Sequence, residues 1–167
     1  MGLKRITQHL LATHRPLRRA FPVPTLAAIE RAIRASERTH RGQIRFVIET
    51  ALDGAPLFSD QTVRERALDV FSLLRIWDTA HNNGVMIYLL FADHTVEIVA
   101  DRGIDAHVGA AGWAAICRDM EAAFRKGAFE RGALDGIAAI TAHLARHFPA
   151  DGTGDNELPD APVVIVR

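Results

Sequence analysis

The sequence has one cysteine, no excess of either charge and no long apolar run. The single cysteine, Cys117, excludes an internal disulfide, a zinc site of several thiolates and an iron–sulfur cluster held by this chain alone. Lys and Arg total 20, as do Asp and Glu, so the chain lacks the basic field on which non-specific nucleic-acid binding depends. Apolar runs such as residues 85–92 are far shorter than the roughly 20 residues needed to span a bilayer, so no transmembrane segment is expected. The hydrophobic share of 49% is typical of a globular domain with a buried core.

Positive charge is concentrated at the start of the chain. Residues 1–20 contain five basic residues and no acidic one. We therefore predict a basic N-terminal arm over residues 1–22. Two alternatives remain for it: peripheral contact with a membrane through an amphipathic helix, or loose packing on its own domain. No apolar core of a signal peptide follows the basic start, which favours a cytoplasmic location.

Residues 23–148 alternate between helical and strand patterns, which predicts an α/β domain. The expected helices cover residues 26–36, 63–77, 113–124 and 134–144, and the expected strands cover residues 43–49, 85–91 and 96–100. Thr62 and Glu65 have the spacing of a capping box at a helix start. Residues 149–167 form an acidic tail rich in Gly and Pro that we expect to be mobile, with 163–166 a weaker candidate for an edge strand. The predicted fold is a central mixed β-sheet of about four strands sandwiched between helices.

Five polar residues are predicted to gather at one edge of this sheet. If Asp93-His94 is a two-residue turn, Met86 lies opposite Asp101 and Asn82 lies opposite Asp105. The convergent residues are then Asp78, Asn82, Asn83, Asp101 and Asp105. Their oxygens are the hard ligands that Ca²⁺ or Mg²⁺ prefers. The alternative is that these residues are ordinary turn and cap residues.

The order of these segments carries a family resemblance. It comprises the first strand, Trp77-Asp78, Asn82-Asn83-Gly84 before the apolar strand, Arg102-Gly103-Ile104 after the returning strand, and the spaced glycines Gly127 and Gly132 before the last helix. Over roughly residues 26–148 this resembles the TPM domain. The resemblance implies a mixed sheet between helices, a cleft at the acidic edge, calcium-type cation binding in some members, and the family label "phosphatase".

The sequence departs from the family pattern at two places. Where the family commonly has Asp-Asn-Gly, this sequence has Asn82-Asn83-Gly84. The replacement removes a charged ligand and implies weak cation binding. Where the family usually has Gly-Tyr-Gly-Leu-Glu, this sequence has Asp101-Arg-Gly-Ile-Asp105. The change adds a carboxylate but places Arg102 beside it. The chain resembles a soluble bacterial branch of a family whose members are often linked to the cell envelope.

The residues themselves give little support to catalysis. Cys117 lacks the arginine of a cysteine-phosphatase loop and lies on an apolar helical stripe. His143 and His147 have a metal-ligand spacing without an evident third ligand. Arg102 is a candidate phosphate ligand, with pairing to Asp101 or Asp105 as its alternative.

Two functional hypotheses follow. The first is an accessory or regulatory module that binds a divalent cation, a protein partner or both at the acidic edge. The second is a metal-dependent phosphoric monoester hydrolase of low activity, with unknown catalytic residues.

Overall fold

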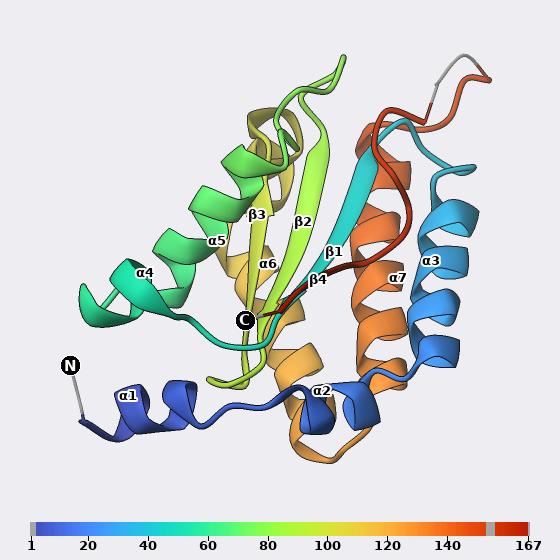
Figure 1. Cartoon of the computed structure of the whole chain (residues 1–167). Helices are drawn as coiled ribbons and strands as arrows, with labels where there is room; N and C mark the ends of the chain where they lie inside the picture. The colour runs from blue at the N-terminus through green and yellow to red at the C-terminus, as the bar shows by residue number, and fades with distance from the viewer. Residues whose placement is uncertain (1–2, 153–155, 167) are drawn as a thin grey trace.

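The computed structural model describes residues 3–152 and 156–166. Its elements follow in the order α1 (Leu3–Leu10), α2 (His14–Ala20), α3 (Val23–Ser36), β1 (Gln43–Glu49), α4 (Gly54–Phe58), α5 (Val63–Leu73), β2 (Gly84–Leu90), β3 (Thr95–Ala100), α6 (Arg102–Arg125), α7 (Phe129–His147) and β4 (Val163–Ile165) (Figure 1). The strands form one sheet in the order β3-β2-β1-β4. Because β1 is parallel to β2 and β4 while β3 is antiparallel to β2, the predicted mixed sheet is confirmed.

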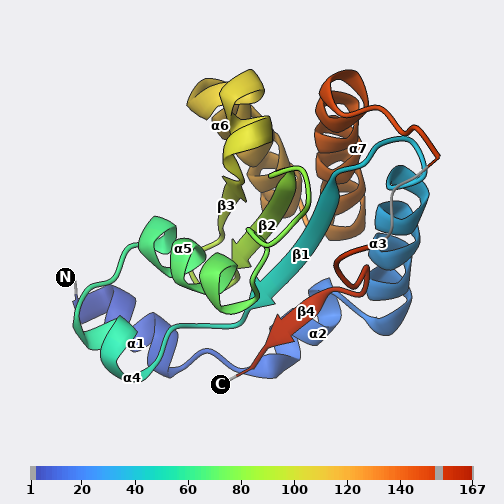
Figure 2. The same cartoon turned by 90° about the horizontal axis from the view of Figure 1, so that it is seen from above.

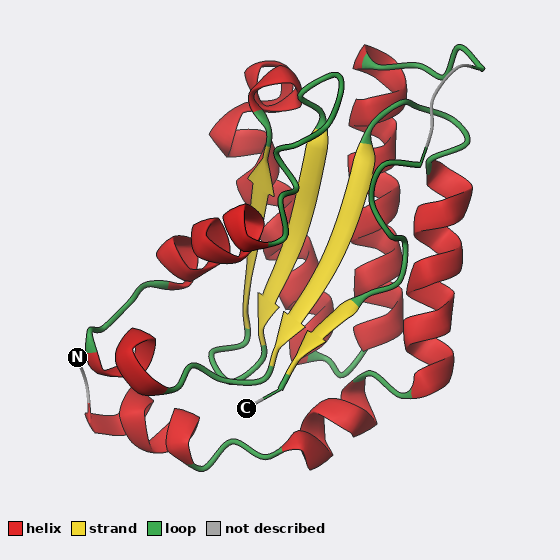
Figure 3. Ribbon diagram, turned by 45° about the horizontal axis from the view of Figure 1, so that its top comes forward, coloured by secondary structure: helices red, strands yellow, loops and turns green. Residues whose placement is uncertain are grey.

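Helices cover both faces of the sheet (Figure 2 and Figure 3). On one face α3, α6 and α7 pack against Ile44, Phe46 and Ile48 of β1. On the other face α4 and α5 pack against Val47 and its neighbours on β2. All seven residues of β2 are buried, as expected for a central strand covered on both sides.

The two long helices α6 and α7 pack closely on the first face. Trp113, Ile116 and Met120 point into the core with Phe124, and none is more than 7% exposed. The predicted apolar stripe is therefore core. A Cβ at Gly136 of α7 would collide with the Met120 side chain, so this glycine permits the close approach of the two helices.

The hairpin between β2 and β3 differs from the predicted one. Val85 pairs with Ala100 and Leu90 with Thr95, so the loop has four residues, Phe91–His94. The predicted register was wrong by two residues. Because side chains alternate with a period of two, Met86 keeps its face and lies opposite Val99 instead of Asp101.

The predicted helix over residues 63–77 is also too long. The capping box at Thr62 and Glu65 is present, but α5 ends at Leu73. Arg75 then adopts a left-handed conformation with φ 53°, which a continuing helix does not allow. Trp77 therefore lies outside the helix and is 49% exposed.

The basic arm is anchored to the domain, in contrast to the loose packing considered above. His9 is fully buried in α1, where its Nε2 lies 2.8 Å from Asp93 Oδ1 and its Nδ1 accepts the Leu52 N–H at 2.8 Å. Arg5 also donates to Asp93. Residues 1–2 of the predicted arm lie outside the described residues.

The described part of the acidic tail is docked, whereas the sequence led us to expect a mobile segment. β4 pairs with β1, and the N–H groups of Glu157 and Leu158 both donate to Gln43 Oε1 at 3.0 Å. Residues 153–155 and 167 of the predicted tail lie outside the described residues. Among the helices in the described ranges, none has the length and apolar character to cross a membrane.

Candidate functional site

The predicted acidic edge lies where β2 begins and β3 ends. The Asp101 N–H donates to the Gly84 carbonyl oxygen at 2.8 Å, which joins the end of β3 to the start of β2. Asp101 is also the N-cap of α6, and its Oδ1 accepts the Arg102 N–H at 2.8 Å. Asp101 and Asn83 are thereby brought to neighbouring positions on paired segments.

Two glycines of the motifs allow backbone to pack on backbone at this junction. A Cβ at Gly84 would collide with the Ile76 carbonyl oxygen. A Cβ at Gly103 would collide with the Asn82 carbonyl oxygen and lie 3.0 Å from that of His81. The carbonyl oxygens of residues 81 and 82 therefore lie against the first turn of α6, where the free N–H groups of the helix favour negative partial charge.

Two side-chain oxygens at the junction have no hydrogen-bond partner within the described ranges. They are Oδ1 of Asn83 and Oδ2 of Asp101, and both atoms are buried. The other polar groups of Asn83 are engaged, since its Nδ2 donates to the Arg41 carbonyl at 3.0 Å and its N–H donates to Thr79 Oγ1 at 3.2 Å. A buried polar atom without a partner costs about 1–3 kcal/mol, and more when it is charged. Each of these oxygens can therefore accept a hydrogen-bond donor or contact a cation.

The other predicted site residues have different surroundings. Asp78 is exposed and forms an ion pair with Arg75 at 2.7 Å. Asp105 accepts the indole N–H of Trp113 at 2.8 Å. Asn82 is exposed and has a left-handed backbone conformation with φ 50°. Its contact with Gly103 is made by its carbonyl oxygen. Throughout residues 3–152 and 156–166, no group of three or more His, Cys, Asp or Glu side chains is placed to hold a metal ion.

An open cleft of about 970 Å³ lies beside the junction. Its polar and aromatic lining includes Trp77, His81, Asn82, Asp101, Arg102 and His107. Neither Trp77 nor His81 was predicted to line this cleft; Trp77 was expected on the apolar face of a helix that in fact ends at Leu73. Arg102 is exposed on this cleft, and its contact with Asp101 is made by its backbone N–H.

His107, which lines the cleft, pairs with a second histidine outside the lining. The rings of His107 and His147 are stacked with centroids 4.2 Å apart. Burial and the neighbouring His107 lower the pKa of His147. His143 instead lies against the Trp113 ring.

The cysteine is not an activated nucleophile. Cys117 is half-buried against the core, and burial raises the pKa of its thiol to about 12. At neutral pH it is a protonated thiol, whereas nucleophilic attack requires the thiolate.

Comparison with known proteins agrees with the motifs at this junction. The family model described as the TPM domain matches residues 20–143. The chain belongs to the TPM domain family. The motif glycines Gly84 and Gly103 both lie in the matched range, whereas α1 and the described C-terminal residues 156–166 lie outside it.

Solved structures share this TPM fold. The NMR structure of the BA42 protein from the psychrophilic bacterium Bizionia argentinensis has a TM-score of 0.75 and 31% identity, and the match covers 86% of this chain and 94% of that chain. The N-terminal domain of a protein from P. gingivalis, also solved by NMR, has a TM-score of 0.50 and 19% identity over 70% of this chain and 73% of that chain. The second likeness concerns the fold alone. The search of curated proteins gives no match.

Proposed function

We propose that this TPM domain is an accessory or regulatory module that binds a divalent cation weakly where β2 begins and β3 ends. The observation that carries the proposal is the pair of buried oxygens without partners, Asn83 Oδ1 and Asp101 Oδ2. Both lie on segments joined by the hydrogen bond between Asp101 and Gly84.

The donor set suits calcium better than magnesium. Calcium accepts carboxylate, amide and main-chain carbonyl oxygens in flexible geometry, whereas magnesium requires a near-ideal octahedron and retains water. The side chains of Asp101 and Asn83 and the main-chain oxygens of residues 81 and 82 are ligands of these kinds. A single carboxylate gives the site little charge, so we expect a dissociation constant in the millimolar range of weak calcium modules.

The cleft beside the junction favours a protein partner. Trp77 is half-exposed on it, and tryptophan is enriched among the residues that dominate binding energy at protein interfaces. A cation bound at Asp101 would change the charge of this surface and thereby regulate the partner's affinity.

A link to the cell envelope is the second part of the proposal, and the arm supports it. Arg15, Arg18 and Arg19 are exposed, and Leu11 nearby is 73% exposed. Basic and apolar side chains on one short segment favour peripheral contact with an anionic membrane surface.

The alternative function is a phosphoric monoester hydrolase of low activity. Arg102 favours it, because its exposed guanidinium lines the same cleft as Asp101 and would hold a phosphate group. A bound divalent cation would supply Lewis acidity there.

Calcium titration of the whole chain tests the proposal. Calcium up to about 10 mM, some tenfold above the dissociation constants of weak calcium modules, should shift the backbone NMR signals of Asn83, Gly84 and Arg102 and raise the melting temperature. Asp101→Asn should abolish both effects while keeping the helix cap, because Asn caps as well as Asp. Asp78→Asn removes the same charge from an exposed ion pair and should keep both effects.

Three outcomes would count against this function. Signal shifts confined to surface carboxylates, or equal responses of the wild type and Asp101→Asn, would exclude the cation site. Metal-dependent hydrolysis of a generic phosphate ester that is lost in both Asp101→Asn and Arg102→Lys would instead favour the hydrolase.

A further inference from the structure

An apolar pocket lies beside the edge strand of the sheet, separate from the cleft described above. It is bounded by α2, the start of α3 and the edge strand β4, which lie close together in Figure 2. Its floor consists of buried side chains: Leu17 of α2, Phe21 at the end of α2 and Ile48 of β1. Ile48 pairs with Val164 of β4, and both residues line the pocket.

Apolar side chains that reach solvent surround the opening of this pocket. Val23 of α3 is 79% exposed, and Val164 and Val166 are exposed as well. Apolar side chains that are exposed singly are common on protein surfaces, whereas a group of them marks an interaction site. The exposed valines therefore indicate that an apolar molecule can cover the opening.

The size of the pocket suits a single hydrocarbon chain. Its volume of about 520 Å³ lies in the lower part of the roughly 300–1,000 Å³ that small-molecule pockets span. A chain laid on Leu17, Phe21 and Ile48 removes apolar surface from water, which is the main favourable contribution to such binding. A lipid with two chains would leave much of its apolar surface in water here.

The charge at the pocket is positive. Arg18 of α2 lines it, and among the described residues no Asp or Glu does so. Within the described ranges the Arg18 side chain has no ion pair or hydrogen bond to another residue, and residues 1–20 contain no acidic residue. A guanidinium binds a carboxylate through charge-assisted hydrogen bonds. The pocket therefore favours an apolar ligand that carries one anionic group.

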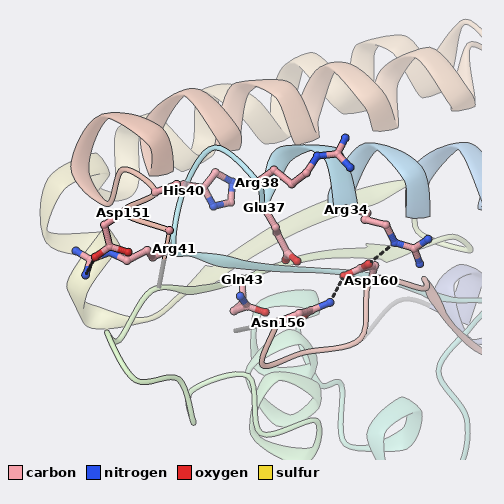
Figure 4. A pocket seen from close by; sticks show the side chains of 11 residues that line it. Arg34, Glu37, Arg38, His40, Arg41, Gln43, Asp151, Asn156 and Asp160 are labelled. Carbon is pink, nitrogen blue, oxygen red and sulfur yellow. Dashed lines mark hydrogen bonds and ion pairs between the residues drawn. The ribbon is translucent and has the colours of Figure 1, made fainter. Parts of the chain in front are cut away.

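The polar pocket in Figure 4 differs in how its charges are used. It lies between the end of α3, the start of β1 and the C-terminal segment, residues 156–166. Arg34 there donates to Asp160 at 2.9 Å, and Arg41 forms an ion pair with Asp151 at 3.1 Å. Arg18 has no such carboxylate partner in residues 3–152 and 156–166, so a ligand can bind it without displacing an acidic residue of the chain.

We propose that the apolar pocket binds a long-chain fatty acid. Its hydrocarbon chain lies against Leu17, Phe21 and Ile48, and its carboxylate binds Arg18 at the opening. A fatty acid is the simplest molecule that combines one chain with one carboxylate. This site does not depend on the cation site at Asp101.

Titration of the whole wild-type chain with dodecanoate, below its micelle concentration, tests the proposal by NMR. Intermolecular NOEs should join the methylene protons of dodecanoate to the methyl groups of Leu17, Ile48 and Val164. Each buried methylene contributes about 0.8 kcal/mol, or about a fourfold change in the dissociation constant, so decanoate should bind up to about 15-fold more weakly. Absence of these NOEs would overturn the proposal, as would equal dissociation constants for decanoate and dodecanoate.

Two pairs of variants test the charge and the place of the site. Arg18→Gln should weaken dodecanoate binding by up to about fivefold, the upper range for an exposed ion pair. Arg15→Gln makes the same change at an exposed arginine of α2 outside the lining and should keep the wild-type affinity. Val164→Glu should abolish the NOEs, whereas Leu73→Glu, at an exposed position of α5, should keep them. Equal effects within either pair would overturn the proposal.

Leu11→Glu separates this site from the membrane contact proposed above, which also uses Arg18. Leu11 does not line the pocket, so the variant should bind phosphatidylglycerol vesicles more weakly and dodecanoate as tightly as the wild type. Dodecanoate binding that persists without vesicle binding supports the pocket site, and its loss in Leu11→Glu overturns that site. A dimer, detected by sedimentation, that excludes dodecanoate would show that a second copy covers the pocket and would also overturn the proposal.

Discussion

Buried polar side chains at two places on the same sheet differ in whether their hydrogen bonds are complete. In the first, Arg66 donates to both oxygens of Glu49 at 2.9 and 2.8 Å, and the Tyr88 hydroxyl donates to Glu49 Oε2 at 2.6 Å. In the second, Asn83 and Asp101 each retain a buried oxygen without a partner in the part of the chain that the structure describes. Both clusters lie next to β2.

The difference separates a complete hydrogen-bond network from side chains whose hydrogen bonds are incomplete. A fully bonded buried network stabilises one arrangement of the chain, whereas an incomplete one is costly. Buried polar atoms without partners are rare in folded proteins, so each one requires a physical reason. At Asn83 and Asp101 the proposed cation would supply that reason, and at Glu49 the hydrogen bonds are already complete.

The largest effect should come from breaking the complete cluster. Glu49→Ala leaves the half-buried Arg66 charge and the buried Tyr88 hydroxyl without their acceptor, so we expect a loss of about 3–5 kcal/mol in the free energy of unfolding. Urea denaturation measures it. Glu97→Ala, which removes one partner of the more exposed pair with Arg64, should lose less than about 1 kcal/mol. Similar losses for the two variants would show that the Glu49 cluster does not stabilise the fold.

A smaller loss is expected where backbone packs on backbone beside the incomplete cluster. Gly103→Ala places a methyl group against the Asn82 carbonyl oxygen, and the resulting shift should cost about 1–3 kcal/mol. In Gly112→Ala the new methyl group meets a Val108 methyl group at 2.7 Å, and a side chain can give way more easily than backbone. We therefore expect a smaller change in urea denaturation for Gly112→Ala, and the reverse order would contradict the close approach at Gly103.

Substitution of Asp101 should not lower the free energy of unfolding, in contrast to substitution of Glu49. Without added cation, Asp101→Asn removes a charge that has an unpartnered oxygen and keeps the helix cap, so stability should be unchanged or rise by up to about 1 kcal/mol. The measurement is urea denaturation in the presence of a chelator. A loss above about 2 kcal/mol would mean that the Asp101 carboxylate is a structural group like Glu49.

The sequence was sufficient to predict the sheet and most of the core. The continuous apolar run of β2 and the alternation in β1 are local patterns, and local patterns were enough. The predicted register of the hairpin was wrong because its loop is held by distant residues. Gln8 donates to the Ala92 carbonyl oxygen, while Arg5 and His9 bond to Asp93. No pattern within residues 85–100 encodes those contacts.

The docked tail and half of the site were missed for a related reason. Gln43, Arg45 and Glu49 alternate on one face of β1, which resembles a solvent-exposed face, yet all three are buried beneath α5 or the C-terminal segment. At the sheet edge, strand pairing places Asp101 opposite Gly84, next to Asn83 in the chain, although the predicted register differed. Asp78 was predicted there from the expected helix end and Asp105 from the predicted hairpin register; the helix ends earlier and the register differs, and the two side chains have Arg75 and Trp113 as partners.

The smallest net effect should be found in a third buried cluster, where two titrations oppose each other. His40 is 2% exposed, with Nδ1 3.1 Å from the Gly42 carbonyl oxygen and Nε2 3.2 Å from Ser36 Oγ. Burial lowers the pKa of His40 to about 4 from an ordinary 6.5, so His40 stabilises the fold above pH 6.5 and loses this effect as pH falls. Glu37, whose pKa is raised to about 8, stabilises the fold at low pH and loses this effect as pH rises.

Between pH 5 and 6.5 these opposite slopes, each up to about 1.4 kcal/mol per pH unit, should nearly cancel in the wild type. Glu37→Gln leaves only the histidine, so its free energy of unfolding should fall as pH is lowered through this window. His40→Asn leaves only the glutamate, so its free energy of unfolding should fall as pH is raised. Urea denaturation at several pH values measures both slopes, with the exposed His94→Asn as a control that should keep the flat profile. Parallel slopes in the two variants would show that His40 and Glu37 do not titrate in opposite directions, because opposite slopes require one pKa to be lowered and the other raised.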